Sequence, residues 1–128
     1  MMFGKRRAIA VDKDAVLARL EGLIETLRVK RELVEPSGSA LDAAVELRRE
    51  SALWIDRAVQ KLRDGTELLR ISLPNARKER ETQRELASLL TQLGDAADDA
   101  TLIWSSAKER LYPLAVSLFE TVETYCTP

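Results

Sequence analysis

Apolar residues recur along the middle of this 128-residue chain at alternating steps of three and four residues. The row comprises Leu41, Val45, Arg48, Ala52, Ile55, Val59, Leu62, Thr66, Leu69 and Leu73. This spacing keeps one face of a helix toward a partner for about nine turns. Beside this seam lies a second stripe, formed by Leu47, Trp54, Ala58 and Leu68. We therefore expect one long helix from near Ala40 to about Ser72.

The same periodicity predicts a helix before the seam. It begins at Asp12 or Asp14, because either carboxylate can cap free backbone amides and interact favourably with the positive end of the helix dipole. Its apolar positions continue to about Val34. The segment 35–39 reads Glu-Pro-Ser-Gly-Ser and ends this helix.

A third helix follows a turn at Pro74, which disfavours helical geometry in the residue before it. Its apolar positions are Leu86, Leu90, Leu93, Ala97, Trp104 and Leu111. Gly94 marks a possible kink within it. Residues 77–85 contain no apolar side chain, so the segment 76–85 is either a solvated helix or a loop.

A short fourth helix is expected at the carboxyl end of the chain. Pro113 removes a backbone donor and clashes with the preceding turn, so we expect the third helix to bend or end after Tyr112. A further apolar face follows, formed by Leu114, Leu118, Val122 and Tyr125. The segment 114–126 either folds back onto the other helices, as short connections favour, or pairs with another chain.

The predicted fold class is all-α: an antiparallel helical bundle of three long helices and a short C-terminal fourth. The chain has 45% hydrophobic, 32% charged and 5% aromatic residues, a composition that excludes a disordered chain and fits an aliphatic core with ionic outer faces. We expect residues 1–128 to form a single domain, with 1–11 as a flexible basic arm.

The register of the expected hairpins predicts a binding surface. A hairpin centred on 35–39 places Val16 near Ala58, and a hairpin centred on Pro74 places Leu62 near Leu86. Neither neighbour then covers the apolar side chains at the tip of the second and third helices. These tip residues are Leu68, Leu69, Ile71 and Leu73. We expect a second chain to cover them, because burial would stabilise each by about 1.5–3 kcal/mol; the alternative is a bend or loop that folds the tip inward.

The sequence offers little catalytic chemistry, since it has no histidine and a single cysteine, Cys126. It also lacks a glycine-rich phosphate loop, so we expect no catalytic residues, no cofactor and no metal site. Asp95 and Asp99 share a helix face beside Asp98 and could bind a hard cation such as magnesium. The simpler interpretation is an acidic helix start after the break at Gly94.

Other charged clusters are best interpreted as solvated helix faces. The carboxylate pairs Glu46–Glu50 and Glu120–Glu123 lack the histidine that a di-metal bundle site needs. The basic run 77–81 alternates with acids and has no aromatic residue for base stacking, so we expect no nucleic-acid partner.

Four residues leave alternatives open. Trp54 and Trp104 either pack in the core or line a ligand cavity. The polar residues Arg48 and Thr66 either specify register within the seam or lie at its edge.

Net charge is −1, but its distribution is uneven. Residues 1–84 hold 18 basic and 14 acidic side chains, a net +4, whereas residues 85–128 hold 2 basic and 7 acidic side chains, a net −5. We interpret this asymmetry as complementarity within the chain or between the chains of a dimer.

The expected function is a non-enzymatic helical protein–protein interaction or homo-oligomerising adaptor protein, with a dimer favoured or another helical protein as the partner. The alternative is a bundle that binds an apolar small molecule or a lipid surface, with peripheral membrane contact. No apolar stretch approaches 18 residues, so we expect no transmembrane segment. One cysteine and no recognisable secretion signal indicate a cytoplasmic location.

Overall fold

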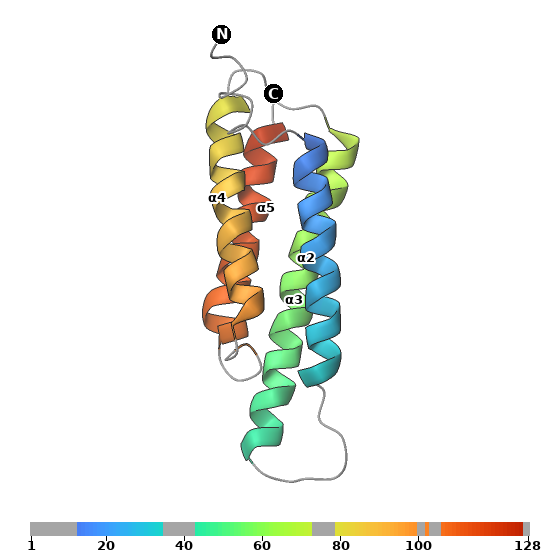
Figure 1. The fold of residues 1–128 in the computed structure, drawn as a ribbon, viewed down its shortest axis with the longest axis vertical. Helices are drawn as coiled ribbons and strands as arrows, with labels where there is room; N and C mark the ends of the chain where they lie inside the picture. Colours follow the sequence, from blue (N-terminus) through green and yellow to red (C-terminus); the bar gives the residue numbers. More distant parts are fainter. Residues whose placement is uncertain (1–12, 35–42, 73–78, 100–101, 103–105, 127–128) are drawn as a thin grey trace.

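A computed structural model describes residues 13–34, 43–72, 79–99, 102 and 106–126 of the chain. Labelled as in Figure 1, its helices are α2 (Lys13–Val34), α3 (Ala43–Ile71), α4 (Glu79–Asp98), the short π-helix η2 (Ala107–Leu111) and α5 (Tyr112–Cys126). Consecutive long helices run in opposite directions (Figure 1). The predicted fold class, three long helices in an antiparallel bundle with a short C-terminal fourth, is confirmed.

The helix bounds agree with the apolar periodicity where the structure describes them. α2 begins at Lys13 and ends at Val34, with Asp14 in its first turn and Arg31 in its last, as the helix dipole favours. α3 continues through Gly65 to Ile71. The expected arm 1–11 and the break at 35–39 lie outside the described residues.

Most of the polar segment 76–85, which the sequence left open as helix or loop, is helical at the start of α4. Residues from Glu79 onward are helical although no apolar side chain precedes Leu86, and Thr82 is buried on the inner face. Position 94 lies inside α4, so Gly94 does not end it. Residues 76–78 lie outside the described part of the chain.

The expectation that Pro113 bends or ends the third helix after Tyr112 is wrong. α4 already ends at Asp98, and a new helix runs from η2 directly into α5 through Pro113. The Tyr112 N–H donates to the carbonyl oxygen of Ala107, five residues earlier. A proline ring clashes with the carbonyl four residues before it in an α-helix, and the wider π turn ahead of Pro113 relieves that crowding.

The helices are arranged differently from a simple sequence of hairpins. α2 packs against α3 and α4, and α5 also packs against α3 and α4. α3 and α4 are therefore diagonal, and the expected hairpin between them about Pro74 is wrong. α3 and α5 run side by side in the same direction (Figure 1). The carboxyl segment folds back into the bundle as α5.

The register of α2 on α3 also differs from the prediction. Lys13 Nζ donates to the carbonyl oxygen of Ser72 (2.9 Å), and Arg70 forms an ion pair with Glu21 (2.7 Å). Val16 therefore lies level with Leu69, not with Ala58.

This shift has two consequences. The pairs Lys13–Ser72 and Glu21–Arg70 place the midpoint of the hairpin later in the chain than the segment 35–39. α2 thus covers the C-terminal end of α3, and Leu69 is 0% exposed in the core. The premise that no helix of this chain covers Leu69 is wrong. The N-terminal turns of α3 instead project beyond α2 (Figure 1).

The core is almost entirely aliphatic. Its fully buried large side chains include Leu20, Leu27, Ile55, Leu62, Leu69, Leu86, Leu90, Leu93, Leu111 and Leu118, with Tyr125 at one end. Thr66 is buried in the seam and satisfies its hydroxyl by donating to the Leu62 carbonyl oxygen (2.8 Å). Arg48 lies at the edge, half-buried, and donates to the Leu33 carbonyl oxygen (3.2 Å) at the end of α2.

Leu69→Ala should lower the free energy of unfolding by about 2–5 kcal/mol, because it removes a fully buried side chain and leaves a cavity. The matched change Ile71→Ala, at a side chain 72% exposed, should alter it by less than about 0.5 kcal/mol. Urea denaturation measures both. Two equally small effects would contradict the observed register of α2 on α3.

Gly65→Ala should stabilise the chain by about 0.5–1 kcal/mol. Alanine is the better helix former, and a Cβ at position 65 would lie 3.8 Å from Val122 Cγ2, an ordinary van der Waals contact. Gly22→Ala, where the added Cβ would meet no side chain and no other helix within 4 Å, is the control that reports helix propensity alone. A destabilised Gly65→Ala beside a stabilised Gly22→Ala would show that α3 and α5 approach more closely than described.

Candidate functional site

The parallel pair α3–α5 forms a surface in which the two helices share a seven-residue register. On α3, Leu47, Trp54, Lys61 and Leu68 are spaced by seven residues, and on α5, Tyr112, Phe119 and Cys126 have the same spacing. Side chains seven residues apart lie nearly on one face of a helix, two turns from each other. We name the surface formed by these seven residues, with Arg57 and Lys108, the α3–α5 crease.

Trp54 and Tyr112 form the first rung of the crease. Their ring centroids are 5.0 Å apart at an interplanar angle of 65°, the edge-to-face arrangement that aromatic pairs favour. Both rings are half-buried. Trp54 therefore packs against a ring from α5 while part of it faces solvent.

Two cations lie on the Trp54 ring. The Arg57 guanidinium carbon is 4.5 Å from the ring centroid, and Lys108 Nζ is 5.7 Å from it. Lys108 also reaches Glu50 at 3.6 Å. Arg57 comes from the helix turn after Trp54, and Lys108 comes from η2, one turn before Tyr112.

Lys61 and Phe119 form the second rung. Lys61 Nζ lies 5.2 Å from the centroid of the half-buried Phe119 ring. The lysine stem thus covers aromatic surface while its charge stays near water. The crease combines aromatic area with positive charge, and neither is fully covered by the rest of the chain.

Leu68 and Cys126 occupy the third level of the crease, and both are partly buried against the core. Partial burial raises the pKa of the Cys126 thiol, while the charge of Lys13 and a hydrogen bond with Ser72 act in the opposite direction. The thiol is therefore protonated at neutral pH and is not an activated nucleophile.

The structure separates the four residues expected to bind a partner. Leu68 lies in the crease, Leu69 lies in the core, and Ile71 is 72% exposed one turn beyond Leu68. Leu73 lies outside the described residues. Leu68 and Ile71 therefore extend the crease toward the C-terminal end of α3, whereas Leu69 is fully buried and cannot contact a partner.

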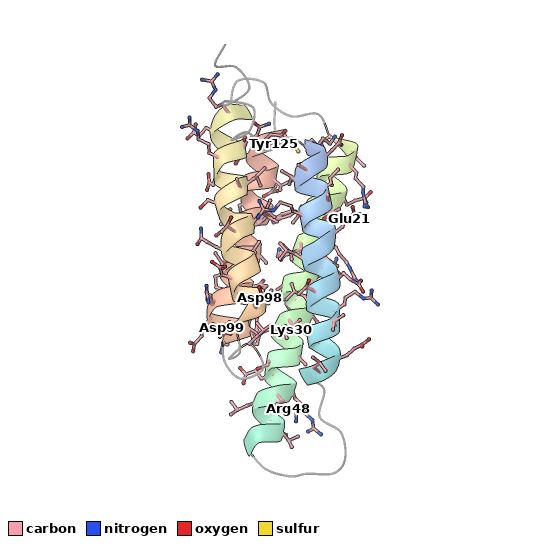
Figure 2. All side chains as sticks on the ribbon, in the orientation of Figure 1. Glu21, Lys30, Arg48, Asp98, Asp99 and Tyr125 are labelled. Carbon is pink, nitrogen blue, oxygen red and sulfur yellow. The ribbon has the colours of Figure 1, made fainter. Side chains whose placement is uncertain are left out.

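The aspartate cluster does not form a metal site among the residues that the structure describes. Asp95 and Asp98 belong to the end of α4, so the expected acidic helix start after Gly94 is wrong. Asp99 accepts a hydrogen bond from Arg110 (3.0 Å). Figure 2 shows Asp98 and Asp99 at the end of α4 where the chain leaves the helix.

The remaining charged candidates lie on outer faces. Glu46 pairs with Arg49 at 3.0 Å, on the part of α3 that projects beyond α2 beside Arg48 (Figure 2). Glu120 and Glu123 are exposed on α5. In the described part of the basic run and just after it, Arg80 and Arg84 are exposed on α4. Trp104 lies outside the described residues.

Three surface grooves are lined mainly by charged and polar side chains. Two lie between α2 and α3, with volumes of about 410 and 350 Å³, and both include Arg63. A third, of about 240 Å³, lies between α4 and α5 and is lined by Glu85, Glu120 and three hydroxyl side chains. Among the residues that line the three grooves, only Ile24 and Val59 are apolar, whereas a pocket for an apolar ligand is lined mainly by apolar side chains.

Comparisons with known proteins provide no relative: no family model, no curated protein and no solved structure matches the chain. Among the helices that the structure describes, none is both long and apolar enough to cross a bilayer.

Apolar spacing within α3 predicts the stripe of Leu47, Trp54 and Leu68 but not the helix that lies beside it. The matching spacing of Tyr112, Phe119 and Cys126 on α5 is the sequence signal for that neighbour. Pro113 obscures this signal, because proline usually predicts the end of a helix at the preceding residue.

Proposed function

We propose that this chain is a non-enzymatic helical protein–protein interaction module that uses the α3–α5 crease as its contact surface. The observation that supports the proposal is the row of half-buried Trp54, Tyr112 and Phe119 beneath Arg57, Lys61 and Lys108. Tryptophan, tyrosine and arginine are enriched among residues that dominate binding energy at protein interfaces.

The exposed ends of the crease support the same function. Leu47 is 46% exposed on the projecting turns of α3, and Ile71 is 72% exposed at the other end of the helix. A partner laid along the crease would bury both together with the outer edges of the aromatic rings. Such burial of an amphipathic helical face is a common mode of protein recognition.

The alternative function, binding of an apolar small molecule or a lipid surface, has weaker support. The residues that line the three grooves are mainly charged, amide or hydroxyl residues, which disfavours an enclosed apolar ligand. Aromatic rings with adjacent cations are compatible with an anionic lipid surface. We place the protein in the cytoplasm, where a protonated single thiol is stable without oxidation.

Photo-crosslinking tests this proposal without assuming which protein binds. A benzophenone amino acid at position 47 should give covalent adducts to a protein in cells that express the chain, because Leu47 belongs to the crease. The same amino acid at position 29 is the matched control, since Val29 is 51% exposed on α2, a helix that does not form the crease.

The adducts should be several-fold more abundant from position 47 than from position 29, measured by mass spectrometry. Protein adducts of equal abundance from both positions, or none from position 47, would contradict the proposal. Lipid adducts alone from position 47 would contradict it in favour of the lipid-surface alternative.

A further inference from the structure

The α3–α5 crease carries opposite charges along its length. Arg57 and Lys61 lie in the part nearer to Trp54. Asp64 follows Lys61 by three residues on α3, and Glu123 follows Phe119 by four residues on α5, so each lies one turn farther along the same side of its helix. Asp64 and Glu123 are both exposed. From Trp54 onward, positive charge therefore precedes negative charge in the common direction of the two helices, and Glu50, which precedes Trp54, is paired with Lys108 of the same chain.

A surface with this polarity is complementary to itself when one copy is reversed. We propose that the α3–α5 crease pairs antiparallel with the crease of a second copy of this chain, about a two-fold axis that passes between Lys61 and Asp64. This inference rests on the proposed function and names the partner. In a two-fold interface every contact occurs twice, with the two chains exchanging roles.

The antiparallel arrangement pairs both the charges and the apolar groups. Arg57 and Lys61 face Asp64 and Glu123 of the second copy, and the same contacts form in reverse. Trp54 lies opposite Leu68 and Ile71 of the second copy, so the half-buried ring at one end covers the partly buried Leu68 and the exposed Ile71 at the other. A parallel pairing of the two creases would instead oppose cation to cation and carboxylate to carboxylate, which is unfavourable.

The crease is large enough for such a dimer. The two copies overlap from Trp54 to Ile71, a length of about 26 Å at about 1.5 Å per residue. Two adjacent helices present a strip about 20 Å wide, so each chain buries about 500 Å² and the pair about 1,000 Å², the size that a specific interface needs.

Charge exchange between two variants tests this geometry. Lys61→Glu alone sets carboxylates against Asp64 of the second copy, and Asp64→Lys alone sets ammonium groups against Lys61, so each variant should dimerise at least about tenfold more weakly than the wild type. Mixed in equal amounts, the two variants should form a heterodimer of near wild-type affinity, since both copies of the contact again join opposite charges.

Sedimentation equilibrium measures the affinities, and native mass spectrometry identifies the heterodimer by its two subunit masses. The wild type should approach twice its chain mass of 14.4 kDa. Arg63→Glu is the matched control: Arg63 is exposed beside Asp64 but lines the α2–α3 grooves, so its reversal should leave dimerisation unchanged. Circular dichroism checks that each variant keeps its helices, and the pair Arg57→Glu with Glu123→Lys repeats the test should either first variant unfold.

A wild type that stays monomeric, or variants that fail to recover affinity on mixing, would overturn the antiparallel dimer. The proposed function survives those results when position 47 still crosslinks to a different protein, and it fails separately when position 47 crosslinks to no protein.

Discussion

The parallel contact between α3 and α5 is the interaction on which the other features of this bundle depend. α3 is the longest helix, with 29 residues, and it packs against α2 on one side and against α5 on another. Because α5 occupies the second side, α4 must lie diagonally across from α3. The same contact seats Phe119 and Val122 beside Gly65 and brings Tyr112 against Trp54. The α3–α5 crease is thus a product of helix arrangement, not of either helix alone.

The sequence was sufficient to predict the helices, because apolar periodicity is a local property. The bounds of α2 followed from Asp14 and the break after Val34, and α3 kept its course through Gly65 because packing outweighs about 1 kcal/mol of poor helix propensity. Pro113 departs from the prediction because proline usually ends or bends a helix, whereas here a π turn accommodates it within a continuous helix.

The arrangement of the helices was not predictable in the same way. Register between α2 and α3 depends on where the hairpin is centred, and the break at 35–39 placed that centre several residues too early. Apolar spacing also does not determine whether α4 packs beside α3 or lies diagonally across the bundle from it. These two errors together left Leu69 without a neighbour and made a core residue look like a binding residue.

Only the α3 half of the candidate site could be predicted from the sequence, for a related reason. Leu68 and Trp54 were assigned to a second stripe from α3 alone, but the meaning of that stripe depends on Tyr112 and Phe119, some 50 to 60 residues away. Charge gave a further hint, since the uneven distribution along the chain indicated complementarity. Only the parallel register places Arg57 and Lys61 before Asp64 and Glu123 along one surface.

Nuclear Overhauser effects between the Trp54 indole and the Tyr112 ring most directly test the parallel packing of α3 and α5. Their centroids are 5.0 Å apart, so cross-peaks between their ring protons should be strong. A Trp104→Phe variant leaves one indole and makes the assignment unambiguous. Cross-peaks from Trp54 to the Cys126 end of α5, with none to Tyr112, would mean that the two helices run antiparallel and that the crease does not exist as described.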